Sequence, residues 1–122
     1  MALIRTGGAA AAKGHFIIVA DDSGVGTKWS ASEIIDSVPT YCTGTAAGNS
    51  SVTIGNATIT GSQGSGGSND RIYTVTGVTG DIYIPDGSGG LELGATITDA
   101  SIGNHVEFST LDHPAMIVIE VK

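Results

Sequence analysis

The segment Ser51–Thr60 constrains the fold of this chain most, because two alternating apolar and polar stretches flank a two-residue turn. The turn is the pair Gly55-Asn56, a combination that favours the tight turns of β-hairpins. It predicts the cross-strand pairs Ile54 with Ala57, Thr53 with Thr58, and Val52 with Ile59. Apolar residues then face apolar residues and polar residues face polar ones, as a hairpin with one buried face requires.

The same texture extends over most of the chain, where Thr, Val, Ile and Tyr alternate with Gly, Asn and Ser. Further strands are predicted at residues 16–20, 71–76, 81–84, 91–98, 105–110 and 116–121. Gly61–Asp70 holds no apolar residue and is predicted to be a flexible linker or hairpin loop. About seven or eight short antiparallel strands indicate an all-β domain, either a small sandwich or a small barrel.

One short helix is predicted near residues 30–38. Ser30 and Glu33 form a capping box, and Pro39 ends the segment. A helix of about two turns does not persist alone in water, so its apolar side would rest on the sheet.

Residues 1–14 are predicted to form an extended or flexible N-terminal arm, and residues 15–122 a single β-rich domain. The four alanines of the arm are flanked by glycines, which oppose the nucleation of so short a helix. The arm carries two basic residues, Arg5 and Lys13, whereas the chain as a whole has a net charge of −7. The arm and the body are therefore opposite in charge.

The composition argues against several classes of protein. Twelve acidic residues face five basic ones, which argues against a nucleic-acid partner, since phosphates require Lys and Arg. No apolar run approaches the length of a membrane span or of a secretory signal. The lone Cys42 can form no intrachain disulfide and is expected to be a small, partly buried residue. We therefore expect synthesis in a cytosol and no membrane association.

Three segments resemble reactive or metal-binding motifs, and each is better explained as a turn or loop. Asp22-Ser23-Gly24 has the triplet of aspartic proteases, but the following residues do not continue that motif. Residues 65–73 depart from the calcium-binding nonapeptide at two positions and lack tandem copies. Asp112-His113-Pro114 has no nucleophile motif beside it, and the three histidines lack metal-ligand spacing. We predict no enzyme, no metal and no cofactor.

Trp29 has two interpretations. A large aromatic ring usually anchors the packing of a core, and it can also form the centre of an interface with another chain. Packing is the favoured interpretation, and Trp29 is retained as a possible interface residue.

A small, cysteine-poor, Ala/Gly/Thr-rich β-domain with an extended arm resembles the capsid decoration (cement) proteins of tailed phages. The arm lies at Thr6–Gly14, and the β body includes Ser51–Thr60, Arg71–Ile84 and Met116–Val121. The resemblance implies a virion protein without catalytic activity, typically a trimer on the capsid whose N-terminal arm adds to a neighbouring sheet. It carries over no functional residues.

The residues themselves suggest how such an arm would bind. Leu3 and Ile4 could enter a partner's sheet edge as an added strand, while Arg5 and Lys13 would anchor the arm on an acidic surface. The prediction is a homo-oligomeric virion structural protein that binds the major capsid protein or another virion protein. A phage fibre or tail component and a carbohydrate- or receptor-binding β module are the alternatives, and a small hydrolase is the least favoured class.

Overall fold

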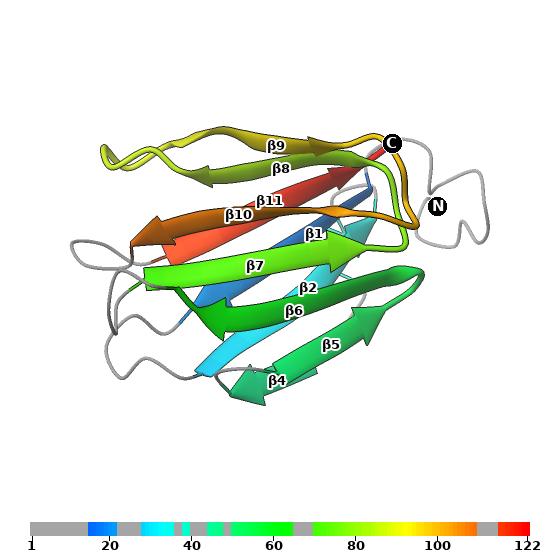
Figure 1. Ribbon diagram of the computed structural model, residues 1–122, viewed down its shortest axis with the longest axis horizontal. Helices are drawn as coiled ribbons and strands as arrows, with labels where there is room; N and C mark the ends of the chain where they lie inside the picture. Colours follow the sequence, from blue (N-terminus) through cyan, green and yellow to red (C-terminus); the bar gives the residue numbers. More distant parts are fainter. Residues whose placement is uncertain are drawn as a thin grey trace.

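The computed structural model describes residues 15–21, 28–35, 38–39, 44–47, 50–64, 70–109 and 115–122. These residues form two antiparallel sheets, with seven strands in one and four in the other, and they contain no helix (Figure 1). The predicted all-β class is confirmed. The described strands form two separate sheets and not a closed barrel.

The larger sheet has the strand order β3-β2-β1-β11-β8-β9, and β4 also pairs with β2. Its strands are β1 (His15–Asp21), β2 (Lys28–Ile35), β3 (Val38–Pro39), β4 (Gly44–Ala47), β8 (Gly80–Pro85), β9 (Leu91–Ile97) and β11 (Ala115–Val121). The smaller sheet has the order β10-β7-β6-β5. Its strands are β5 (Ser50–Ile54), β6 (Ala57–Gln63), β7 (Asp70–Thr76) and β10 (Asn104–Ser109).

The two sheets pack face to face around one shared apolar core, in the manner of a β-sandwich. Figure 1 looks through the four-stranded sheet onto the seven-stranded sheet behind it. Alternation along each strand supplies the core, as in β7, where every second residue is buried. Its largest fully buried side chains are Tyr73, Ile17, Ile59, Ile82, Ile97, Ile117, Ile119, Val19 and Val75.

Strands from the two ends of the described chain meet in the middle of the larger sheet. β1 lies between β2 and β11, and β11 in turn pairs with β8. Between β5 and β11 the chain passes to the other sheet three times, after β7, after β9 and after β10.

The predicted hairpin is confirmed, including its register. Val52 pairs with Ile59, Thr53 with Thr58, and Ile54 with Ala57. Gly55 has φ +59°, the left-handed conformation that the first turn position requires.

The other predicted strands are also confirmed, with small differences at their ends. The strand predicted at 91–98 ends one residue earlier, at Ile97, and the one predicted at 105–110 begins one residue earlier, at Asn104. The loop predicted for Gly61–Asp70 is shorter than expected, because residues 61–63 continue β6 and Asp70 begins β7. The structure has more strands than the sequence predicted, chiefly because β2, β3 and β4 were not foreseen.

The short helix predicted near residues 30–38 is wrong, because residues 30–35 belong to strand β2. An isolated two-turn helix would bury one narrow side, whereas β2 pairs with β1 over seven consecutive positions. The extended conformation also places Trp29 and Ala31 in the core. Tertiary pairing therefore outweighs the local capping signal of Ser30 and Glu33.

Candidate interaction surfaces

The residues predicted to bind a partner lie in two different places. Leu3, Ile4, Arg5 and Lys13, with the rest of the arm at 1–14, lie outside the described residues. Trp29 lies inside the sandwich, with 3% of its surface exposed. Its ring is therefore part of the core and offers almost no surface to another chain.

Trp29 belongs to an aromatic cluster that joins the two sheets. Its ring meets that of Tyr73 edge to face, with the centroids 5.4 Å apart, and Tyr73 stacks on Phe108 at 5.9 Å. Gly61 of β6 lies against the same rings, and a Cβ there would come within 2.8 Å of both Trp29 and Tyr73. A glycine at this position lets the backbone approach the two rings.

The outer face of the seven-stranded sheet is mostly apolar. Side chains that alternate with the core residues of five adjacent strands point to this side. We call these residues the apolar face: Phe16, Ile18, Ile34, Tyr83, Leu91, Leu93, Met116 and Val118. Three of them are plainly exposed, Leu91 at 41%, Leu93 at 56% and Met116 at 39%. An antiparallel sheet that has water on its outer side normally places polar residues there.

Two apolar runs in the sequence correspond to this face. Phe16–Ala20 and Met116–Ile119 are unbroken apolar runs, not alternating ones. Such runs are typical of strands that are covered on both faces. β1 and β11, the two central strands of the sheet, are formed by these runs.

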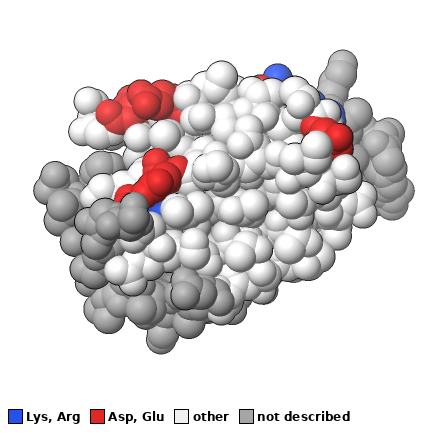
Figure 2. Space-filling model, viewed as in Figure 1, with Lys and Arg blue, Asp and Glu red and all other residues white. Residues whose placement is uncertain are grey.

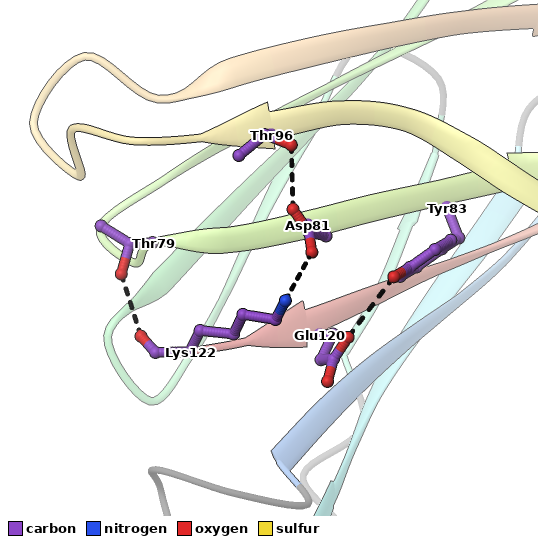
Figure 3. A network of polar contacts seen from close by, with 6 residues as sticks. All are labelled: Thr79, Asp81, Tyr83, Thr96, Glu120 and Lys122. Atoms are coloured by element: carbon purple, nitrogen blue, oxygen red, sulfur yellow. Dashed lines mark hydrogen bonds and ion pairs between the residues drawn. The ribbon is translucent and has the colours of Figure 1, made fainter.

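A polar network borders the apolar face at one end (Figure 3). Lys122 donates from Nζ to Asp81 at 2.8 Å, and the Thr96 hydroxyl donates to the same carboxylate at 2.9 Å. These hydrogen bonds, chiefly that of Lys122, lower the pKa of Asp81, and Asp81 in turn raises the pKa of Lys122. Beside them the Tyr83 hydroxyl lies 3.5 Å from a carboxylate oxygen of Glu120. Lys122 neutralises Asp81, whereas Glu120 places a second carboxyl group in the outward row between Phe16 and Asp81.

The outer face of the four-stranded sheet has a different chemistry. It presents the hydroxyl face, which consists of Ser51, Thr53, Thr58, Thr60, Ser62, Thr74 and Thr76. Neighbouring hydroxyls bond across the strands, with Ser51 and Thr60 at 2.7 Å and Thr53 and Thr58 at 3.3 Å. Figure 2 shows this side as a broad surface without charge, with acidic groups only towards its ends. Hydroxyl groups bond to water as well as to each other, so this face is suited to solvent.

Two carboxyl groups meet at one end of the hydroxyl face. Asp70 of β7 and Glu107 of β10 lie together over Gly64, where a Cβ would collide with both. The hydrogen bond between them raises the pKa of Glu107. Arg71 points to the inner side of the sheet and is 5% exposed. The two carboxyl groups therefore form a close acidic pair at this end of the sheet.

A polar pair is enclosed at the edge of the core. His15 of β1 donates from Nε2 to Glu33 of β2, and both side chains are largely buried. His15 Nδ1 has no hydrogen-bond partner. Glu33 Oε2 lies 3.6 Å from the position of a Cβ on Gly55, so the β5–β6 turn covers the pair. This arrangement makes the pair part of the interior.

The remaining sequence candidates lie outside the described residues. They are Asp22-Ser23-Gly24, Cys42, residues 65–69 and Asp112-His113-Pro114. Within the described ranges, no three His, Cys, Asp or Glu side chains come together as a metal site. No described segment is a helix that could span a lipid bilayer.

The described surfaces are therefore two broad sheet faces, one apolar and one lined by hydroxyl groups. No protein-family model, no curated protein and no solved structure matches this chain.

Proposed function

We propose that this chain is a non-enzymatic structural protein of virions, of the capsid decoration type, which acts by packing against other proteins. The observation that carries the proposal is the apolar face on the seven-stranded sheet. Contiguous exposed apolar surface on a small water-soluble domain marks a site of association. The resemblance of the sequence to decoration proteins supports the assignment to virions.

The two faces suit a protein that is covered on one side and wet on the other. The apolar face gains free energy when it is removed from water, by about 25 cal/mol for each Å². The hydroxyl face gains little, because its groups already bond to water and to each other. A decoration protein needs this polarity, since one side meets the assembly and the other meets solvent.

The N-terminal arm is the second part of the proposal. Leu3 and Ile4 enter a sheet edge of the neighbouring protein, and Arg5 and Lys13 hold the arm on an acidic surface. The whole chain has a net charge of −7 and the arm contributes +2, so the body carries −9 and would offer such a surface to the arm of another copy.

Localisation in purified particles tests the proposal. Virions of the phage that encodes the chain are purified on a density gradient, their peptides are identified by mass spectrometry, and cryo-electron microscopy locates the chain. We expect it on the outer surface of the capsid. Peptides found only in the lysate of infected cells, and never in the particles, would overturn the proposal.

A variant that lacks residues 2–14 tests the role of the arm. We expect it to lose particle binding while its circular dichroism remains that of a β protein. A full-length variant with the same arm residues in shuffled order is the matched control for length and charge. Equal binding by all three chains would contradict the role of the arm.

A further inference from the structure

We infer that the open part of strand β9, at the edge of the seven-stranded sheet, binds the N-terminal arm of a second copy as an added antiparallel strand. The inference rests on the proposed function, in which the arm enters a sheet edge, and it names that edge. Three observations carry it: the exposure of β9, the charge around it, and a register that matches the sequence of the arm.

β9 is an exposed edge strand. It ends the path of the larger sheet, and among the described strands only β8 pairs with it (Figure 1). An edge strand presents unpaired backbone N–H and C=O groups, to which an extended segment can add. Residues 91–94 are all exposed, with Leu91 at 41% and Leu93 at 56%. This half of β9 is therefore open to another strand.

The other half of β9 is closed. Asn104 donates from Nδ2 to the backbone carbonyl oxygen of Thr96 at 3.0 Å, so this acceptor is already used. Between the two halves a bulge opposite Ile82 skips Gly94 in the pairing with β8, and a bulge interrupts the regular edge. An added strand therefore fits along residues 91–94 and not along the whole of β9.

The charge around β9 is complementary to that of the arm. Residues 86–103, which are β9 and the turns on either side of it, contain no basic residue. Their acidic residues are Asp86, Glu92 and Asp99, all exposed. The arm has two basic residues, Arg5 and Lys13, and no acidic one. The arm is thus attracted to this edge, although the two bodies repel each other.

The length of the arm limits that repulsion. When residues 3–6 are bound, residues 7–14 remain as a tether that spans about 26 Å in extended form. This length is several times the screening length of about 8 Å at physiological salt. The acidic bodies can therefore stay apart while the arm is bound.

One antiparallel register satisfies both charge and hydropathy. Arg5 lies opposite Glu92, a pair of opposite charge. Its neighbour Ile4 lies opposite Leu93, a pair of apolar side chains. Both kinds of cross-strand pair stabilise a sheet, and antiparallel pairing is the more stable arrangement for each residue. A slip by one residue would place Arg5 opposite a leucine, so the register is specific.

The body to which the arm belongs is a poor acceptor in this register. Phe16 of β1 and Thr96 of β9 lie in one row, three strand spacings apart. The arm would leave β9 at Leu91, at the other end of that strand, so its return to β1 would cover about 24 Å. The tether of residues 7–14 spans about 26 Å only when it is straight, which leaves almost no length for the reversal of direction. A second copy has no such constraint.

An exchange of charges in the full-length chain tests the inference. Arg5→Glu and Glu92→Lys each place like charges at the contact, whereas a mixture of the two variants restores opposite charges in every mixed contact. Glu107→Lys makes the same change at an exposed residue of the other sheet and is the control. Sedimentation equilibrium gives the dissociation constants, and native mass spectrometry separates mixed from unmixed oligomers.

We expect the wild type to associate and each of the two variants to raise the dissociation constant about tenfold, because a favourable cross-strand pair becomes repulsive. The mixture should contain chiefly mixed oligomers, with a dissociation constant close to that of the wild type. Glu107→Lys should associate like the wild type.

A wild-type chain that is monomeric at all concentrations overturns the inference, and an arm paired with its own β9 would give this result. Equal amounts of mixed and unmixed oligomers overturn it as well, as does an equal loss of association in Glu107→Lys. The proposed function is judged separately. A monomer found in virions removes only the contact between arm and edge, whereas an oligomer with the expected charge pattern that is absent from virions removes only the virion role.

Discussion

Replacing the buried Gly61 by alanine should destabilise the sandwich, because the new Cβ would collide with two aromatic rings. The new Cβ would lie 2.8 Å from Trp29 Nε1 and 2.8 Å from Tyr73 Cε1. Ordinary contact begins at 3.4 Å. Each ring would therefore have to move away from the new Cβ by about 0.6 Å in a close-packed core. Both rings are buried, with 3% and 0% exposure, and Tyr73 is also stacked on Phe108.

The magnitude follows from two opposing effects. Overpacking a core costs about 1–3 kcal/mol, whereas loss of glycine freedom in the unfolded chain stabilises by about 0.4–1 kcal/mol. The free energy of unfolding should therefore fall by about 1–2 kcal/mol at Gly61→Ala. With a denaturant slope of about 1–3 kcal/mol/M, the urea midpoint should fall by about 1 M.

Urea unfolding followed by fluorescence measures this change directly, because Trp29 is the only tryptophan and lies at the altered contact. Ser62→Ala, at the next residue of β6 but on the outer face, is the control and should stay within about 0.5 kcal/mol. In a Tyr73→Leu background the cost of Gly61→Ala should shrink, because one of the two rings is gone. A midpoint for Gly61→Ala equal to or above that of the wild type would refute the packing described for this cluster.

Three further predictions concern polar pairs. Glu33→Ala should lower the free energy of unfolding by about 3 kcal/mol, measured in urea, because it leaves His15 buried without its partner. Replacing both residues by leucine should recover most of this loss. A double variant at least as unstable as Glu33→Ala would contradict this prediction. The raised pKa of Glu107 stabilises the folded state below the ordinary carboxyl pKa and ceases to do so as the pH rises through the folded value. Glu107→Gln should therefore raise the thermal midpoint at neutral pH but not below about pH 4, and an equal gain at both pH values would contradict the assignment. The lowered pKa of Asp81 stabilises the fold at pH values above the ordinary carboxyl pKa, and this effect is lost as the pH falls through the pKa of the folded state. The thermal midpoints of the wild type and Lys122→Gln should therefore converge below about pH 3. A difference in thermal midpoint that stays constant with pH would show that the Lys122–Asp81 pair does not cause it.

The parts of the fold that the sequence predicted are those set by neighbours along the chain. The Ser51–Thr60 hairpin has its pairing fixed by a two-residue turn and by alternation, so its register could be derived residue by residue. The order of the other strands in the two sheets could not be derived in this way. β1 pairs with β11 across almost the whole chain, and many apolar strands of similar length would satisfy the same pattern.

The wrong helix and the unpredicted apolar face have one physical origin. Each depends on what lies beside a segment in space, and a sequence read locally does not contain that information. Ser30 and Glu33 match a capping box, yet β1 offers β2 a longer pairing partner than a short helix could find. The run Phe16–Ala20 was correctly predicted to be a strand, but which sheet it enters decides which of its sides remains exposed.

The contrast between the two outer faces follows from the same two-residue period that builds the core. In β6 and β7 most outward positions hold threonine or serine, with Asp70 and Ile72 as the exceptions, so the strands meet water on one side and the core on the other. In β1 and β11 the outward residues Phe16, Ile18, Met116 and Val118 are apolar, whereas Glu120, which lies opposite Phe16, is acidic. A shift of one residue in either pair of strands would exchange inner and outer side chains, and in β1 and β11 it would exchange one apolar set for another. Such a shift would turn Glu120 towards the core and would separate the His15–Glu33 and Lys122–Asp81 pairs, and each of these changes opposes it. The polar contacts around the apolar face thus serve specificity of folding, while the apolar residues between them remain available for packing against another chain.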